Sequence, residues 1–360
     1  MSEYLGALHE TAVRFPETDI WMDTCGVEEL DYGVKRGIVG ATSNPVIIGQ
    51  VIKDELPLLE GKIKELIAEM PTATEEEICW ALIDYVGADR SKKLLPVFEQ
   101  YKGKKGRLSI QVNAKYYRST DKIVEQACHL NTLGPNMQVK MPASAAGIAA
   151  MEEVTYRGVS INATVSFTVS QAIAVAEAVE RGLNRRKAEG LPVDDMAPVC
   201  TMMIGRVDDW LKNDLKAKGI EPEQPEALDW AGVACMKHAY RIFKERGYTC
   251  RLLSAAYRNY QQWYAFIGAD VCMTINYKWH KNINSCDIPV KSYIDEPLEA
   301  PYMDYLLTLP EFHKAYDEDG QKPEDFQFYG AFQNTLNGFI KGYEELLAVI
   351  RDYMIWPEKH

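Results

Sequence analysis

The chain has 360 residues, and 40 Lys and Arg against 52 Asp and Glu give it a formal net charge of −12. Hydrophobic residues make up 47% and charged residues 26%, as in a globular protein with a sizeable core. The acidic total argues against nucleic-acid partners, which call for a basic surface. No apolar run approaches the roughly 20 residues of a spanning helix, and the N-terminus lacks a signal-peptide pattern. We therefore expect a cytoplasmic protein without membrane partners.

Cysteine, histidine and glycine show no cofactor-binding spacing. The eight cysteines are scattered and form no CxxC pair, and the six histidines show no metal-ligand spacing. We expect the cysteines to be reduced and mostly buried, and the spacing leaves open whether one is a reactive thiol. No GxGxxG or P-loop pattern occurs. The sequence thus predicts neither a metal site nor a cofactor.

Short apolar runs alternate along the chain with longer amphipathic stretches. The predicted strands cover residues 18–25, 38–45, 107–113, 137–144, 159–167, 197–205, 250–256 and 270–275. Helical patterns separate them, with two or three helices expected between residues 46 and 100. Parallel strands need such crossovers, and nearly continuous apolar strands fit a sheet covered on both faces. We predict an α/β fold, a TIM (β/α)8 barrel over residues 18–275, with an open doubly wound sheet as the alternative.

The pattern changes after the last predicted strand. Residues 276–301 read as a loop rich in aromatic and acidic side chains, and a helical segment follows from about 323 to 354. We expect this segment to pack across the barrel, over its mouth. No internal repeat or linker is visible, so we predict one domain over residues 1–360, with 276–360 as a C-terminal extension of the barrel.

Polar residues stand at the ends of the predicted strands, where a TIM barrel carries its catalytic groups. We expect these side chains to converge on one pocket. In chain order they are Asp23, Thr42, Ser43, Asn44, Gln111, Asn113, Lys140, Asn162, Thr164, Thr201, Arg206, Ser254 and Arg258.

Lys140 is the most informative of these residues. It lies between Val139 and Met141 in a predicted central strand. Desolvation there should lower its pKa, and a neutral amine can attack a carbonyl to form a Schiff base. Alternatively, the ammonium reaches out to a carboxylate such as Asp23. Spacing alone favours neither interpretation.

The other charged candidates also allow two interpretations. Asp23 is either a general acid or base, or the counter-ion of Lys140. Arg206 and Arg258 each follow a strand end, where a guanidinium can hold a phosphate with two hydrogen bonds. Surface ion pairs are their more common role, and the segment RVDDW offers the carboxylates for one.

The segments TSNP, VKMPA, NATVSF and GRVDDW occur in this order within residues 18–275. Together they resemble the transaldolase family. The resemblance implies a TIM barrel that uses Schiff-base chemistry without a metal or organic cofactor. It implies that Lys140 forms the Schiff base, that Asp23 takes the proton of the donor's C4 hydroxyl, and that Thr164 holds the catalytic water. The substrate-binding residues that it implies are Thr42, Asn44, Asn162, Thr201, Arg206 and Arg258.

The chain departs from the family pattern at five positions, one of which is Thr201 in place of the usual serine. Gln111 stands where transaldolases usually have a water-activating glutamate, and glutamine there resembles the fructose-6-phosphate aldolase branch. Met203 replaces the phenylalanine or tyrosine of the two branches. Asn113 and Ala256 replace residues that are usually acidic and serine. The missing hydroxyl at Ala256 leaves another anionic terminus, such as a sulfonate, open.

The sequence thus predicts a transaldolase-type transferase of the pentose phosphate pathway, which moves dihydroxyacetone from a ketose phosphate to an aldose phosphate. Gln111 would be its fourth catalytic residue, and sugar phosphates its partners. The alternatives are an aldolase that releases free dihydroxyacetone, an enzyme for another anionic ketose, and a non-catalytic binding barrel. The oligomeric state stays open, a homo-oligomer included.

Overall fold

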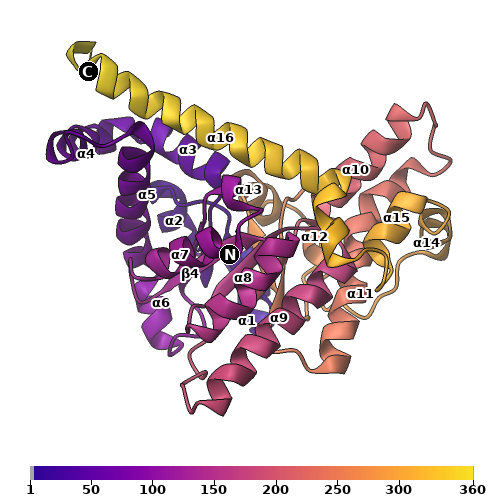
Figure 1. Cartoon of the computed structure of the whole chain (residues 1–360). Helices are drawn as coiled ribbons and strands as arrows, with labels where there is room; N and C mark the ends of the chain where they lie inside the picture. Colours follow the sequence, from indigo (N-terminus) through magenta and orange to yellow (C-terminus); the bar gives the residue numbers. More distant parts are fainter. Residues whose placement is uncertain (1–3, 360) are drawn as a thin grey trace.

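The computed structural model describes residues 4–359, which form a closed barrel of eight parallel strands in chain order. Figure 1 shows the helices that surround this barrel. This confirms the predicted TIM barrel. Apolar residues dominate the strands, which are buried almost throughout. The strands are β1 (Asp19–Met22), β2 (Gly40–Thr42), β3 (Arg107–Gln111), β4 (Met137–Pro142), β5 (Ile161–Ser166), β6 (Val199–Met202), β7 (Arg251–Ser254) and β8 (Cys272–Ile275).

Helices surround the barrel, and several begin where the sequence carries a capping residue. Thr74 and Glu77 form a capping box at the start of α5, and Thr168 and Gln171 form one at α9. The α-helices are α1 (Ala7–Arg14), α2 (Val27–Val34), α3 (Pro45–Asp54), α4 (Leu56–Glu69), α5 (Glu75–Ser91), α6 (Leu95–Gln100), α7 (Thr120–Asn131), α8 (Ala145–Tyr156), α9 (Val169–Ala188), α10 (Ile204–Ala217), α11 (Ala231–Arg246), α12 (Gln261–Tyr264), α13 (Tyr277–Asn284), α14 (Ala300–Leu306), α15 (Pro310–Tyr316) and α16 (Gly330–Ile355). The 3-10 turns are η1 (Lys92–Leu94), η2 (Ala114–Tyr116), η3 (Pro225–Trp230), η4 (Pro323–Phe328) and η5 (Pro357–Lys359).

The register of the strands places the predicted polar residues side by side. Gln111 of β3 pairs with Lys140 of β4, and Lys140 pairs with Asn162 of β5. Paired residues of parallel strands point to the same face of a sheet. The three side chains therefore form a row on one face, the face that lines the barrel.

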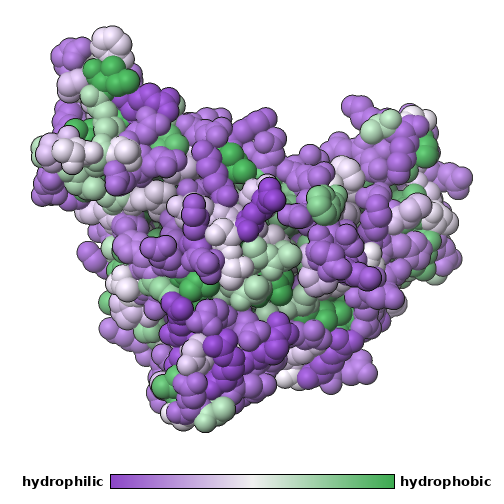
Figure 2. Space-filling view, in the orientation of Figure 1, coloured by the Kyte–Doolittle hydropathy of each residue, from purple (hydrophilic) through white to green (hydrophobic). Residues whose placement is uncertain are grey.

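The predicted terminal helical segment is present as η4 and the long helix α16. In Figure 1, α16 runs from beside α10 to beyond α4. It contacts the segments that follow β2, β3 and β6, so it lies across the C-terminal face of the barrel. An ion pair joins Arg351 to Glu75 of α5, and the Trp80 indole donates to the Tyr343 hydroxyl (3.1 Å). Figure 2 shows a mostly hydrophilic surface with an apolar patch at the projecting end of α16.

The structure differs from the sequence prediction in several helical regions, and α14 and α15 are two helices that the sequence analysis did not predict. Residues 46–100 hold four α-helices, α3 to α6, where two or three were expected. Helix α13 lies within the predicted loop, where its start is fixed by the Asn276 side chain, which accepts from Trp279 N (3.0 Å). Only His280 and Ile283 of this helix are buried, too few to produce a clear apolar period. The crossover between β7 and β8 contains only the single turn α12.

All eight cysteines are free thiols, and six of them are buried, as the sequence predicted. Within residues 4–359 no helix combines the length and apolar character needed to span a membrane.

Candidate active site

Lys140 lies in the middle of the barrel with 3% of its surface exposed. Its Nζ donates to the backbone oxygen of Ser43 (3.1 Å). Among residues 4–359 no carboxylate lies within ion-pair distance of this nitrogen. Burial lowers the Lys140 pKa, and the nearby charge of Asp23 opposes that change without reversing it. An amine in this setting can lose its proton and attack a carbonyl carbon.

Asp23 follows β1 and faces Lys140 without direct contact. Thr42 Oγ1 donates to Asp23 Oδ1 (2.7 Å) and also lies 2.6 Å from the Thr274 hydroxyl of β8. Burial raises the pKa of the Asp23 carboxyl, and the charge of Lys140 and the Thr42 hydrogen bond both act in the opposite direction. A carboxyl with a raised pKa is suited to accept and return a proton.

A groove of about 790 Å³ leads from solvent to Asp23. Its walls come from α2, α3 and α13, and it includes Gln50 of α3 and Tyr277 of α13. Asp23 keeps a partly exposed surface for this reason. The groove gives a polar substrate a route to the barrel mouth.

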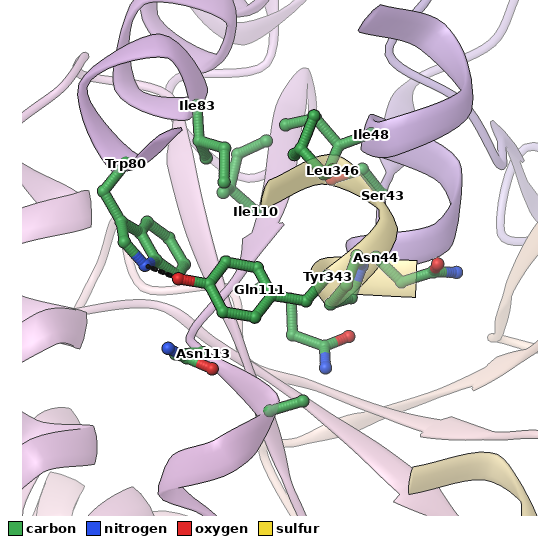
Figure 3. Close-up of a pocket in the computed structure, with 12 residues that line it drawn as sticks. Ser43, Asn44, Ile48, Trp80, Ile83, Ile110, Gln111, Asn113, Tyr343 and Leu346 are labelled. Atoms are coloured by element: carbon green, nitrogen blue, oxygen red, sulfur yellow. Dashed lines mark hydrogen bonds between the residues drawn. The ribbon is translucent and has the colours of Figure 1, made fainter. Parts of the chain in front are cut away.

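Gln111 has 3% of its surface exposed, and neither its Nε2 nor its Oε1 has a hydrogen-bond partner among residues 4–359. It lines a narrow cavity of about 10 Å³, beside Trp80, Tyr343 and Leu346 (Figure 3). That volume holds about one water molecule. Buried amides are normally hydrogen-bonded, so the free amide of Gln111 marks a place where a water or a substrate group fits.

Asn162 and Thr201 belong to a hydrogen-bonded network inside the barrel. Thr201 Oγ1 donates to Asn162 Oδ1 (2.7 Å), and Asn162 Nδ2 donates to Ser109 Oγ (3.1 Å). The network fixes the orientation of the amide next to Lys140, and one N–H of Asn162 stays available to a ligand. Thr164 on the same strand is fully buried, and its hydroxyl lies 4.0 Å from the Met203 sulfur.

Two of the predicted polar residues cap helices. Asn44 Oδ1 accepts from the backbone N of Val46 (2.9 Å) and of Ile47 (3.0 Å) at the start of α3. Asn113 Oδ1 accepts from Lys115 N (3.0 Å) at the start of η2, and Asn113 lies beyond the end of β3. These carbonyl oxygens are therefore engaged by the backbone, and only the Asn44 and Asn113 amide N–H groups remain for a ligand.

Arg206 and Arg258 differ in whether their guanidinium groups have a partner. Arg258 is partly exposed and binds Asp209 through both Nη2 (2.8 Å) and Nε (3.2 Å), so it forms the ion pair that RVDDW offered. Arg206 is partly buried, and among residues 4–359 its guanidinium has no hydrogen-bond or ion-pair partner. Burial and then the neighbouring charge of Arg258 lower the Arg206 pKa.

Sequence reasoning missed three site residues. Thr274 stands at the end of β8, and the strand-end rule would have found it had it been applied to the eighth strand. Trp80 and Tyr343 come from α5 and α16. No local pattern indicates that these two aromatic residues reach the barrel mouth.

The fold and this site define a (β/α)8-barrel protein with a buried lysine and a nearby carboxyl at the C-terminal ends of its strands. Residues 20–306 match the family model described as Transaldolase/Fructose-6-phosphate aldolase. The chain therefore belongs to this family, which confirms the resemblance seen in its motifs.

Named relatives agree with the family assignment. Transaldolase 2 of Streptomyces avermitilis is 30% identical over 233 residues, which cover 62% of this chain and 62% of the relative. Transaldolase of Thiobacillus denitrificans is 30% identical over 234 residues, which cover 63% of this chain and 64% of the relative. The chain thus spans somewhat less than two thirds of the length of the curated relatives it matches.

Proposed function

We propose that this protein is a transaldolase-type transferase that moves a dihydroxyacetone unit from a ketose phosphate, such as fructose or sedoheptulose phosphate, to an aldose phosphate. The observation that carries the proposal is Lys140, a buried amine with a lowered pKa and no carboxylate in contact. Such an amine is the nucleophile that carbonyl chemistry needs. Asp23 supplies a proton-accepting group on the neighbouring side of the barrel mouth.

The reaction begins when neutral Lys140 attacks the C2 carbonyl of the ketose and forms a carbinolamine. The carbinolamine hydroxyl takes up a proton from solvent and leaves as water, which gives a protonated imine. Asp23 then takes the proton of the C4 hydroxyl. The C3–C4 bond breaks, its electron pair moves into the imine, and the aldehyde phosphate departs. The three-carbon unit stays on Lys140 as an enamine. It adds to the carbonyl of the acceptor, Asp23 returns its proton to the new hydroxyl, and water releases the product.

Further residues serve binding and water positioning in this proposal. Thr164 and Gln111 hold the water of the imine steps. The Gln111 amide supports this role because it has no hydrogen-bond partner in the described part of the chain, residues 4–359. Thr42, Asn44, Asn162 and Thr201 bind the dihydroxyacetone part. Asn162 and Thr201 support one another, since their hydrogen bond (2.7 Å) fixes both side chains before a substrate arrives.

Arg206 and Arg258 bind the anionic end of the sugar in this proposal. Arg206 has a free guanidinium, while Arg258 holds Asp209 and acts through its charge. The chemistry needs no metal or organic cofactor. We also assign the protein to the cytoplasm, where reducing conditions suit its eight free thiols.

One observation favours a second candidate function. A glutamine amide can orient a water molecule but cannot take its proton, so Gln111 alters how the imine is hydrolysed. The fructose-6-phosphate aldolase branch, which Gln111 resembles, releases free dihydroxyacetone. An aldolase of this type is therefore the alternative to the transferase.

The deciding experiment measures glyceraldehyde 3-phosphate release from fructose 6-phosphate, with and without erythrose 4-phosphate. Sustained release only with the acceptor supports the transferase, and sustained release without it supports the aldolase. Borohydride trapping with peptide mapping tests the Schiff base in parallel. Trapping on Lys140 without turnover would mean that Lys140 forms the Schiff base but that the natural substrate is a different ketose. Failure of every ketose to trap would contradict the proposed chemistry.

A further inference from the structure

Strand β5 is irregular directly after Thr164. Between Ala163 and Ser166 its pairing with β6 shifts register, as at a β-bulge. Val165, inside this bulge, has a left-handed backbone conformation with a φ of +52°. Such a φ is an outlier for a β-branched residue, because the branched side chain crowds its own backbone there. The conformation of Val165 is therefore strained, and the surrounding structure must hold it in place.

Thr164 has little that fixes its side chain directly. Among residues 4–359, the one hydrogen-bond contact of its hydroxyl is with the Met203 sulfur at 4.0 Å, and a thioether sulfur is a weak acceptor. Its backbone oxygen accepts from Ala143 N (2.7 Å), which lies just past the end of β4. The position of the Thr164 hydroxyl therefore depends on how the backbone of β5 is held.

The side chain of Gln171, in the first turn of α9, holds this backbone. Gln171 is fully buried, and its Nε2 donates to the backbone oxygens of Val165 (3.1 Å) and Ala143 (3.1 Å). Its Oε1 accepts from the backbone N of Phe167 (2.9 Å) and of Thr168 (3.3 Å). Peptide N–H groups donate and peptide oxygens accept, so the network fixes the orientation of the Gln171 amide.

These four hydrogen bonds are more than a helix cap needs. A capping box uses only an acceptor at this position, and glutamate serves there as well as glutamine. In the capping box of α5 the corresponding residue is Glu77. Only an amide also has two N–H groups, and those of Gln171 join the end of β4, the strand of Lys140, to the end of β5, the strand of Thr164.

We infer that Gln171 is a positioning residue of the proposed reaction, on which this inference rests. Its amide keeps Val165 in the left-handed conformation and thereby keeps the Thr164 hydroxyl on the face of the sheet that carries Lys140. Lys140 pairs with Asn162, and Thr164 lies two residues further along β5, so its side chain belongs on that same face. Gln171 does not touch the substrate. It acts through Thr164, which is proposed to hold the water of the imine steps.

The first test compares Gln171→Glu with Thr168→Val as the control. Glutamate keeps an oxygen that accepts from Phe167 and Thr168, but it can donate to at most one of the two backbone oxygens. Thr168→Val removes the hydroxyl that caps Gln171 N (3.0 Å) and leaves both donor bonds of the Gln171 amide in place. Both variants should lower the melting temperature, but only Gln171→Glu should lower kcat, by about tenfold. Equal kcat in the two variants would overturn the inference.

The second test is a double-mutant cycle with Thr164→Val, which removes the hydroxyl itself. If Gln171 acts through Thr164, then Gln171→Glu should lower kcat no further once Thr164→Val is present. Independent losses that multiply in the double variant would show a general effect on the fold and would overturn the inference. An unchanged kcat in Thr164→Val would overturn it as well, because Gln171 would then have no hydroxyl to act through.

A crystal structure of Gln171→Glu tests the placement of Thr164 without any substrate. It should show Val165 outside the left-handed region and the Thr164 hydroxyl displaced. An unchanged backbone at Val165 and an unchanged Thr164 side chain would overturn the inference, even if the enzyme is a transaldolase. Failure of every ketose to trap on Lys140 would contradict the proposed reaction alone. The displaced Thr164 would then still support its positioning by Gln171.

Discussion

The two ends of the barrel differ in whether their charged side chains have ion-pair partners within the protein. At the N-terminal end, Asp19 is 2% exposed and pairs with Arg251 (2.6 Å) and with Lys105. Arg251 in turn pairs with Asp270 (2.8 Å). Each charge of this cluster, which we call the barrel floor, has an oppositely charged neighbour in contact.

At the C-terminal end, Asp23 lies four residues further along the same strand direction, and its one side-chain partner among residues 4–359 is Thr42. In the same part of the chain, the hydrogen bond to the Ser43 carbonyl is the one that Lys140 Nζ makes, and the Gln111 amide has no hydrogen-bond partner. The charged groups of the barrel floor form ion pairs within the protein, and these ion pairs stabilise the fold. The polar groups of the mouth keep hydrogen-bonding atoms available for a ligand, and leaving them unpaired lowers the stability of the fold. This division matches the roles of the two faces in TIM barrels.

The largest effect is expected from Lys140→Ala. Loss of the nucleophile should reduce turnover by more than roughly a thousandfold, since Lys140 is the only buried lysine among residues 4–358. The free energy of unfolding should stay the same or rise, because a buried charge without an ion pair is removed. Coupled assays and urea unfolding measure the two effects. Full activity in this variant would rule out the Schiff-base mechanism.

Asp23→Asn should lower the rate of C–C cleavage by about 10²–10⁴-fold, the usual range for a general acid or base. It also removes the charge that raises the Lys140 pKa. Lysine reacts when it is neutral, so the trapping rate rises as pH increases through that pKa. The midpoint should lie below 10.5 in the native protein and lower still in Asp23→Asn. An unchanged midpoint in cyanoborohydride trapping would show that the two groups do not interact.

Asp19→Asn tests the barrel floor. It leaves Arg251 and Lys105 partly buried without the shared carboxylate, and we expect a loss of about 3–5 kcal/mol in unfolding free energy. The kcat of the folded protein should change little, since the floor lies at the opposite end of the barrel from Lys140. Urea unfolding and kcat at low temperature measure the two quantities. A kcat loss as large as that of Asp23→Asn would contradict the division between floor and mouth.

The smallest effect is expected from Gln111→Glu, which turns the free amide into a base for water. The balance between hydrolysis and transfer should shift toward transfer by a few-fold, if position 111 activates the water of the imine steps. The ratio of free dihydroxyacetone to transfer product measures this balance. An unchanged ratio would mean that position 111 does not control it.

Much of the fold follows from local patterns in the sequence. The short apolar runs around Ile110, Val139 and Ala163 fit buried strands, and the helical stretches between them indicate parallel connections. Their positions at strand ends then predict that Asp23, Gln111 and Lys140 meet at one end of the barrel. Helix α13 was missed because its buried stripe consists of only His280 and Ile283.

The sequence by itself determined the barrel, its polar mouth and the family, because these depend on residue type and spacing within single elements. Only the tertiary structure decided which polar groups have partners. Among residues 4–359 it paired Arg258 with Asp209, left Arg206 without a partner, and brought Tyr343 of α16 to the cavity beside Gln111. The physical reason is that hydrogen bonds and ion pairs form at about 3 Å between segments far apart in the chain. A pattern within one segment does not determine which distant side chain comes within that distance.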